Sequence, residues 1–199
     1  MRVIGTVGLP GSGKSEAAAV ARTLDIPVVT MGDVIREVCR SRGYNPAEHH
    51  GTVAKSLREE EGPAAIAERS LPIIRTKLET NATVLVDGLR SDVELNCFRD
   101  AFDDDFVLIS IEAPFESRAV RLGERGRDKT DLDETAVQKR DERELGFGMG
   151  TAMERADIVI ENTESLSEFH ETVRDVLTHR IVDTPDHTDN SQRQHTQSE

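Results

Sequence analysis

The chain has 199 residues, which is enough for one α/β domain with a sizeable core. Only 4% of the residues are aromatic and Trp is absent, so the core must be built from Val, Ile, Leu and Ala. The formal net charge of −13 would repel a polyanion, which argues against nucleic acid as a general partner. The apolar runs are too short to span a membrane or to form a signal segment, so we expect a cytoplasmic protein without a membrane partner.

The basic residues are unevenly divided between 20 Arg and 5 Lys. Excess acid together with scarce Lys favours a high-salt, halophilic cytoplasm, in which self-repulsion is screened. An ordinary acidic protein is the alternative. Cys39 and Cys97 lack metal-ligand spacing, and we interpret them as reduced, small hydrophobic side chains. The sequence does not indicate an oligomeric state.

Strands and helices alternate along the chain. The expected strands are 3–7, 26–30, 83–86, 106–111 and 157–160. The expected helices are 14–24, about three within 31–80, one beginning after Ser91, one at Pro114, 133–145, and a last one capped by Ser165. This alternation predicts a parallel sheet with helices on both faces, a three-layer α/β sandwich.

Two segments are not needed for the sheet. Residues 31–80 form a helical insertion that we expect to cover a substrate, and residues 115–150 form a charged lid region. Together with the sheet they make a single domain over residues 1–182. The segment 183–199 has almost no apolar residues and is expected to be a disordered, polar tail.

The strongest motif is GLPGSGKS at residues 8–15, which matches the complete phosphate-loop pattern. Its glycines allow backbone angles that turn several N–H groups toward one anion, and the following helix adds its N-terminal dipole. Lys14 is expected to reach the β- and γ-phosphates. The predicted nucleotide-binding residues of the loop are Gly8, Leu9, Pro10, Gly11, Ser12, Gly13, Lys14 and Ser15.

A metal-binding carboxylate is expected at the end of the third strand. The apolar run Val84-Leu-Val86 ends in Asp87, as a Walker-B strand does. We therefore predict that Asp87 and the Ser15 hydroxyl hold Mg²⁺. The alternative is that Asp87 only begins a turn with Gly88.

Three residues are candidates for an acceptor site. Asp33 and Arg36 lie one helical turn apart after the second strand, where Asp33 could orient or deprotonate an acceptor and Arg36 could grip a phosphate. Asp33 could equally be a helix cap. Arg90 follows Asp87 at the carboxyl edge of the sheet and either contacts a phosphate or forms a surface ion pair.

Arginines recur on one face of the helix that follows Pro114. Arg118, Arg121 and Arg125 have the spacing i, i+3 and i+7 and predict a lid that stabilises transferring phosphates, with Arg121 and Arg125 as catalytic candidates. The alternative is a set of helix ion pairs with Glu116, Glu124, Asp128 and Asp141. Lys139, Arg140 and Arg143, on the following helix, are weaker candidates for the same role. Asn162, after the last strand, is placed to touch a base or ribose.

In order, the motifs GLPGSGKS, TMGDVIR, VDGLR, the Arg-bearing segment and ADIVIEN resemble those of nucleoside monophosphate kinases and dephospho-CoA kinases. More closely, the chain resembles an uncharacterised family of archaeal P-loop kinases. The resemblance covers nearly all of residues 1–180. It implies a five-stranded parallel sheet in the order 2-3-1-4-5, ATP and Mg²⁺ as the donor, and a phosphorylated small-molecule acceptor.

The sequence therefore favours a small-molecule kinase that transfers the γ-phosphate of ATP to a nucleotide-like or CoA-precursor acceptor. Two departures bear on the acceptor: Asp87-Gly-Leu-Arg90 is one residue shorter than the usual monophosphate-kinase element, and a single acid, Asp33, follows strand two where dephospho-CoA kinases have a pair. The alternative function is a nucleotide-binding regulatory ATPase without a dedicated acceptor. A nucleic-acid-processing ATPase conflicts with the net charge.

Overall fold

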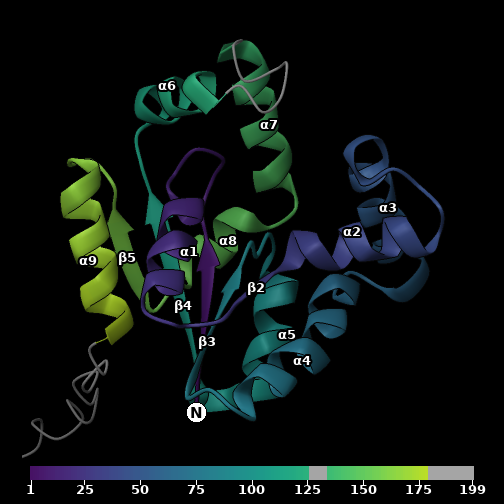
Figure 1. Cartoon of the computed structure of the whole chain (residues 1–199). Coiled ribbons are helices and arrows are strands. Elements are labelled where there is room, and N and C mark those ends of the chain that lie inside the picture. The colour runs from purple at the N-terminus through teal and green to yellow at the C-terminus, as the bar shows by residue number, and fades with distance from the viewer. Residues whose placement is uncertain (126–133, 179–199) are drawn as a thin grey trace, which may run out of the picture.

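The computed structural model describes residues 1–125 and 134–178, and Figure 1 shows their arrangement around one sheet. The sheet has five parallel strands in the order β2-β3-β1-β4-β5, which confirms the predicted fold and strand order. The strands are β1 (Arg2–Val7), β2 (Val28–Thr30), β3 (Thr83–Asp87), β4 (Phe106–Glu112) and β5 (Ile158–Glu161).

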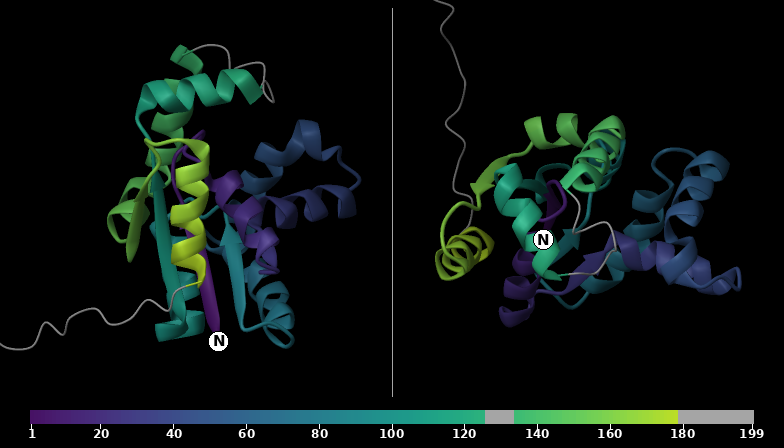
Figure 2. Two further views of the ribbon diagram at one scale, coloured as in Figure 1. Left: turned by 60° about the vertical axis from the view of Figure 1, so that its left-hand side comes forward. Right: turned by 90° about the horizontal axis from the view of Figure 1, so that it is seen from above.

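Side chains alternate between the two faces of the sheet, and each face has its own core. On β1, Val3 and Val7 belong to the core under α4 (Ala65–Leu78), α5 (Asp92–Phe102) and α8 (Met149–Glu154), whereas Ile4 belongs to the other core. That second core lies under α1 (Lys14–Thr23) and α9 (Leu166–Thr178). The views in Figures 1 and 2 show α1 and α9 together on their side of the sheet. Burial on both faces explains why the inner strands read as continuous apolar runs.

The insertion between β2 and β3 forms three helices, as predicted: α2 (Met31–Ser41), α3 (Pro46–Glu61) and α4. Asn45 caps α3 by accepting a hydrogen bond from Ala47 N at 3.1 Å, and Pro46 takes the first helical position. Helices α2 and α3 extend beyond the sheet, whereas α4 packs back on it (Figure 1). The insertion therefore forms a side wall next to the carboxyl ends of β2 and β3.

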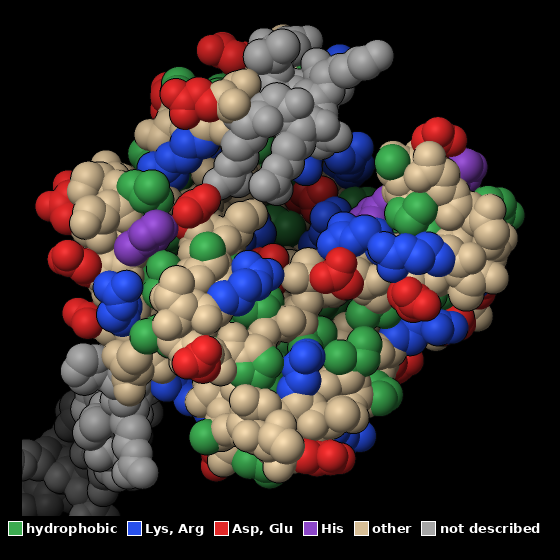
Figure 3. Space-filling model, in the orientation of Figure 1, with side chains coloured by type: hydrophobic (Ala, Val, Ile, Leu, Met, Phe, Trp, Pro, Cys, Tyr) green, Lys and Arg blue, Asp and Glu red, His purple; other side chains and the backbone are tan. Residues whose placement is uncertain are grey.

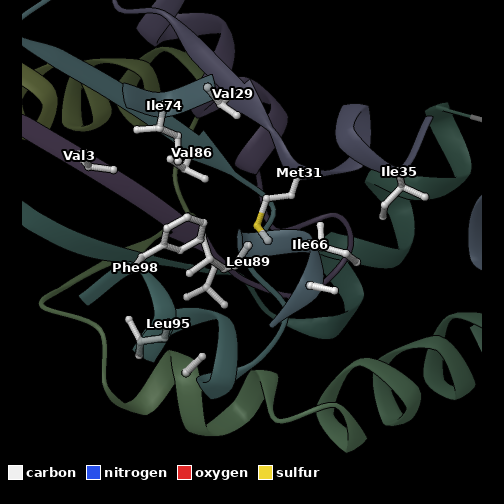
Figure 4. Packing of buried hydrophobic residues seen from close by; sticks show 14 of the residues in the cluster. Val3, Val29, Met31, Ile35, Ile66, Ile74, Val86, Leu89, Leu95 and Phe98 are labelled. Atoms are coloured by element: carbon white, nitrogen blue, oxygen red, sulfur yellow. The ribbon is translucent and has the colours of Figure 1, made fainter. Parts of the chain in front are cut away.

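Buried aliphatic side chains attach this insertion to the sheet. Figure 4 shows Met31, Ile35 and Ile66 converging with Leu89, which follows β3, in one cluster. All four are at most 4% exposed. The expected aliphatic core is confirmed, and it fixes α2 and α4 against the loop that carries Arg90.

Two helices lie on the opposite side of the carboxyl edge. They are α6 (Phe115–Arg125) and α7 (Glu134–Gly146), close to the expected positions. A short additional helix, α8, was not predicted. The region 126–133 within the expected lid, the side chain of Arg125, and the expected tail at 183–199 lie outside the described residues.

Both helices begin at the predicted serine cap, but only the box at α9 is reciprocal, because Glu94 Oε2 accepts from Arg90 N at the start of α5. Ser91 Oγ accepts a hydrogen bond from Glu94 N at 3.1 Å at the start of α5. At the start of α9, Ser165 Oγ accepts from Glu168 N, and the Glu168 carboxylate accepts from Ser165 N in return. These local signals fix where each helix begins, because the first N–H groups of a helix need partners.

Candidate functional site: a phosphate loop open to an arginine-lined cavity

The phosphate loop turns sharply between β1 and α1. Gly8, Gly11 and Gly13 all have positive φ, at 151°, 81° and 121°. A Cβ at Gly11 would lie 2.8 Å from the carbonyl oxygen of Arg118, so a side chain is excluded by contact as well as by conformation. No side chain caps α1 at Gly13. The first N–H groups of that helix are therefore available to an anion.

Lys14 closes over this loop. Its ammonium group donates to the carbonyl oxygens of Gly8 and of Leu9, the latter at 3.1 Å. Burial lowers the pKa of Lys14 to about 8, against the opposing attraction of Asp87. A half-buried ammonium group that donates to carbonyl oxygens gains a stronger partner when a phosphate arrives, so the geometry suits anion binding.

Asp87 and Ser15 both line the cavity next to Lys14. Thr6, on β1, donates its hydroxyl to Asp87 Oδ1 at 3.1 Å, which fixes one carboxylate oxygen at the end of β3. In the described part of the chain, no group of three or more His, Cys, Asp or Glu side chains could hold a metal ion. One carboxylate and one hydroxyl are oxygen ligands of the kind that Mg²⁺ takes together with phosphate oxygens and water.

The cavity has a volume of about 350 Å³ and joins the phosphate loop to the insertion. In Figure 3 it is the hollow between helices α6 and α7 and the insertion, with Lys and Arg side chains at its border. Lys14 and Asp87 line it from the phosphate loop and the end of β3, and Arg36, His50 and Arg58 line it from the insertion. Its size is in the lower range of small-molecule sites.

Arg36 and Asp33 are brought together, but not in the way expected from the sequence. Arg36 lines the cavity, whereas Asp33 is not among the described residues that do so, and its side chain is 67% exposed. Asp33 instead accepts a hydrogen bond from Arg36 Nε at 2.8 Å and forms an ion pair with Arg36 Nη2 at 2.6 Å. In this structure Asp33 acts on the cavity through the guanidinium that it orients.

Arg90 lies in the cavity and pairs with Glu144 of α7, through Nη1 at 3.1 and 3.3 Å from the two carboxylate oxygens. Its backbone N–H donates to Glu94 Oε2 at 2.8 Å. Glu94 is completely buried, and its other oxygen accepts from Arg58 of α3 at 3.0 Å. Two buried glutamates therefore position Arg58 and Arg90 at this cavity.

The predicted lid arginines face different partners. Arg118 is buried and donates to the carbonyl oxygens of Pro10 and Ala113, at 3.1 and 3.2 Å. Its guanidinium also binds Asp141 of α7 with two contacts, of 3.0 and 2.6 Å. Arg118 thus fastens α6 and α7 to the phosphate loop. Arg125 lies at the end of α6, but its side chain is outside the described residues.

Asn162 is packed against the phosphate loop. It is 5% exposed, and its Nδ2 donates to Ser12 O at 2.8 Å. Arg121 Nη2 donates to the carbonyl and side-chain oxygens of Asn162, at 3.0 and 3.2 Å. Arg121 Nη1 and Ser12 Oγ are buried and have no hydrogen-bond partner within the described part of the protein. Unpaired buried donors beside a phosphate loop fit a ligand-binding site, because leaving them unpaired is costly.

Several residues of the cavity were not predicted from the sequence as site residues. Glu94 is predicted only as part of a capping box, and Glu144 lies in a helix rich in charged residues that singles none of them out. Asp141 is expected only as an ion-pair partner of the arginine cluster, and it does pair with Arg118. His50 lines the cavity, and burial lowers its pKa, with nearby arginines lowering it further. Only the chain's path brings these groups together; the local sequence carries no signal for them.

The comparisons with known proteins agree with this geometry. The family model described as "AAA domain" matches residues 7–138. A UPF0200 protein of Halobacterium salinarum is 57% identical over 95% of this chain and 97% of its own length. A UPF0200 protein of Methanosarcina acetivorans is 46% identical over 89% of this chain and 94% of its own.

Solved structures share the fold at low sequence identity. TT1252 from Thermus thermophilus superposes with a TM-score of 0.57 at 20% identity, over 88% of this chain and 96% of its own. A shikimate kinase from Acinetobacter baumannii, in complex with shikimate, gives 0.55 at 17% identity, over 89% and 93%. None of the helices within residues 1–125 and 134–178 is long and apolar enough to cross a membrane.

Proposed function

We propose that this chain, which belongs to the UPF0200 family of P-loop proteins, is an ATP-dependent kinase of a small molecule. One observation carries the proposal: a single cavity is lined both by the phosphate loop with Lys14 and by two arginines from outside that loop, Arg36 and Arg90. A site that only bound a nucleotide would not need a second basic wall across the transferred phosphate. A shikimate kinase and a gluconokinase share this fold, which supports the proposal of a small-molecule kinase.

In the proposed reaction the protein positions groups and stabilises charge. The loop N–H groups and Lys14 bind the phosphates of ATP, and Ser15 and Asp87 would hold Mg²⁺. When bound, Mg²⁺ neutralises charge that develops on the phosphate oxygens. Arg118 and Asn162 keep the loop in shape through Pro10 O and Ser12 O. Arg121 and Arg125 remain our candidates for stabilising the transferred group from α6.

The acceptor lies between the insertion and the loop after β3. We propose that it is a nucleotide-like molecule or CoA precursor that carries a phosphate, which Arg36 and Arg90 would bind. Asp33 does not line the cavity but holds the Arg36 guanidinium, so the role we propose for it is to orient Arg36 toward the acceptor. The apolar floor of Met31, Ile35 and Ile66 would pack against the body of the acceptor.

A nucleotide-binding regulatory ATPase is the second candidate. One observation favours it: Arg36, Arg58 and Arg90 are each already paired with a carboxylate of the protein. Arginines that are paired within the protein are what we expect of a cavity that binds no acceptor. The two functions differ in whether any acceptor accelerates ADP release.

The test is ADP release from ATP and Mg²⁺ across a panel of nucleoside monophosphates, dephospho-CoA and hydroxy acids. A kinase shows strong stimulation by one acceptor class, and Lys14→Ala or Asp87→Ala removes it. Lys55→Ala and Asp100→Ala are matched controls, because both residues are exposed helix positions away from the cavity, and they should retain full activity. If ATP binds and no acceptor raises turnover, the kinase proposal fails and the regulatory function takes its place.

A further inference from the structure

The pair between Arg90 and Glu144 joins the two walls of the cavity. Arg90 follows β3, and Glu144 lies on α7, on the lid side. The two side chains differ in accessibility, since Arg90 is 42% exposed and Glu144 only 4%. Both line the cavity. The guanidinium is therefore open to a ligand while its carboxylate partner is enclosed.

The backbone that carries Arg90 is held independently of this pair. Glu94 accepts from the Arg90 N–H at 2.8 Å and is itself fixed by Arg58 at 3.0 Å. A change of partner at the Arg90 guanidinium would therefore leave the loop in place. The exchange needs only a side-chain movement.

Helix α7 is likewise anchored at a second point. Asp141, one turn before Glu144, makes two contacts with the buried Arg118, which in turn binds Pro10 O. Arg140 precedes Glu144 by four residues on the same helix and also lines the cavity. At that spacing a cation is within reach of Glu144, so the carboxylate would not be left buried and uncompensated.

We propose that Glu144 is a tethered anion that occupies the acceptor's anion subsite on Arg90, and that the acceptor's phosphate binds by displacing it. The inference rests on the proposed function, because it takes Arg90 as a contact of the acceptor. Glu144 then sets the affinity and selectivity of the subsite: a weakly charged molecule does not displace it, whereas a phosphate does. Displacement of Glu144 also explains how Arg90 can bind the acceptor although it is paired with a carboxylate in this structure.

The experiment measures binding of inorganic phosphate to the full-length protein by calorimetry. A non-hydrolysable ATP analogue with Mg²⁺ first fills the phosphate loop, so that only the acceptor side is open. Glu144→Gln removes the competing charge and should bind phosphate about tenfold more tightly, a typical size for coupling between competing ligands. Glu142→Gln makes the same change on the exposed face of α7 and should match the wild type.

Further variants define the site. In an Arg90→Gln background, Glu144→Gln should give no gain, because the subsite has lost its guanidinium. Glu144→Asp shortens the side chain by one methylene and should give a smaller gain than Gln, which keeps the test usable if Glu144→Gln unfolds. A melting curve of each variant establishes that it is folded.

Three results would overturn the inference: unchanged or weaker phosphate binding by Glu144→Gln relative to Glu142→Gln, an equal gain without Arg90, or no phosphate binding by any folded variant. Because binding is measured without turnover, its outcome is separate from that of the kinase assay. A phosphate gain without acceptor-stimulated ADP release would leave the subsite standing and refute the kinase.

Discussion

The pair between Arg118 and Asp141 gives the sharpest test of how the phosphate loop is supported. Its side chains are 5% and 11% exposed, and the two oxygens of Asp141 lie 3.0 and 2.6 Å from the guanidinium. Asp141→Asn removes the charge and leaves a buried guanidinium without its counter-ion. Breaking a buried pair in this way costs about 3 kcal/mol or more of unfolding free energy.

For a domain of this size, a loss of about 3 kcal/mol lowers the melting temperature by roughly 6–12 °C. The measurement is thermal unfolding followed by circular dichroism, at one fixed KCl concentration. Glu37→Gln is the matched control, because it breaks a pair with Arg40 whose side chains are 74% and 60% exposed. That exposed pair contributes about 0.5 kcal/mol or less, a shift of about 1–2 °C.

Asp141→Asn should also weaken ATP binding several-fold, because Arg118 holds the loop through Pro10 O. Calorimetric titration with ATP and Mg²⁺ checks this, and Glu37→Gln should bind as the wild type does. If the melting temperature of Asp141→Asn lies within about 2 °C of that of Glu37→Gln, the buried pair does not stabilise the fold by the predicted amount.

Three further predictions concern the loop, its lysine and the surface. Gly13→Ala forces a side chain into a φ of 121° and against Asn162, so ATP affinity measured by calorimetry should fall at least about tenfold, and unchanged affinity would contradict the loop geometry. Burial lowers the pKa of Lys14 to about 8, and bound triphosphate should raise it, so ATP binding should take up a fraction of a proton at pH 8.5 and almost none at pH 6.5. Titration in two buffers of different ionisation enthalpy measures this uptake, and its absence at pH 8.5 would refute the role of Lys14. With a net charge of −13, the protein should gain melting temperature from dilute buffer to about 2 M KCl through screening, whereas a flat profile would argue against adaptation to salt.

The fold was predictable because its signals are local. The glycines of the phosphate loop, the apolar strands and the Ser91 and Ser165 caps each determine structure within a few residues of themselves. Burial on both faces makes the strands readable as apolar runs. The strand order followed from the resemblance to P-loop kinases rather than from these signals, and the sheet has that order.

The arginine pairs of the cavity were less predictable than the fold, because the two partners of each pair are far apart in the sequence. Arg58 and Glu94 are 36 positions apart, and Arg90 and Glu144 are 54 apart. The helical period correctly placed Arg118 on α6. Whether its side chain turned to a ligand or to the interior depended on Asp141, which belongs to another helix. A charged residue becomes a site residue or a buried support through its tertiary partners, which a local pattern does not specify.

If the protein is a kinase, the γ-phosphate of ATP must pass to an acceptor held in this cavity. The most direct measurement follows the γ-phosphate of ATP, carried as a radioactive label, into product in the presence of Mg²⁺ and the acceptor that most stimulates ADP release. We predict that the label appears on the acceptor in equal amount to the ADP formed, and that Asp87→Ala abolishes this transfer. Label found only as inorganic phosphate, whatever acceptor is present, would contradict the claim.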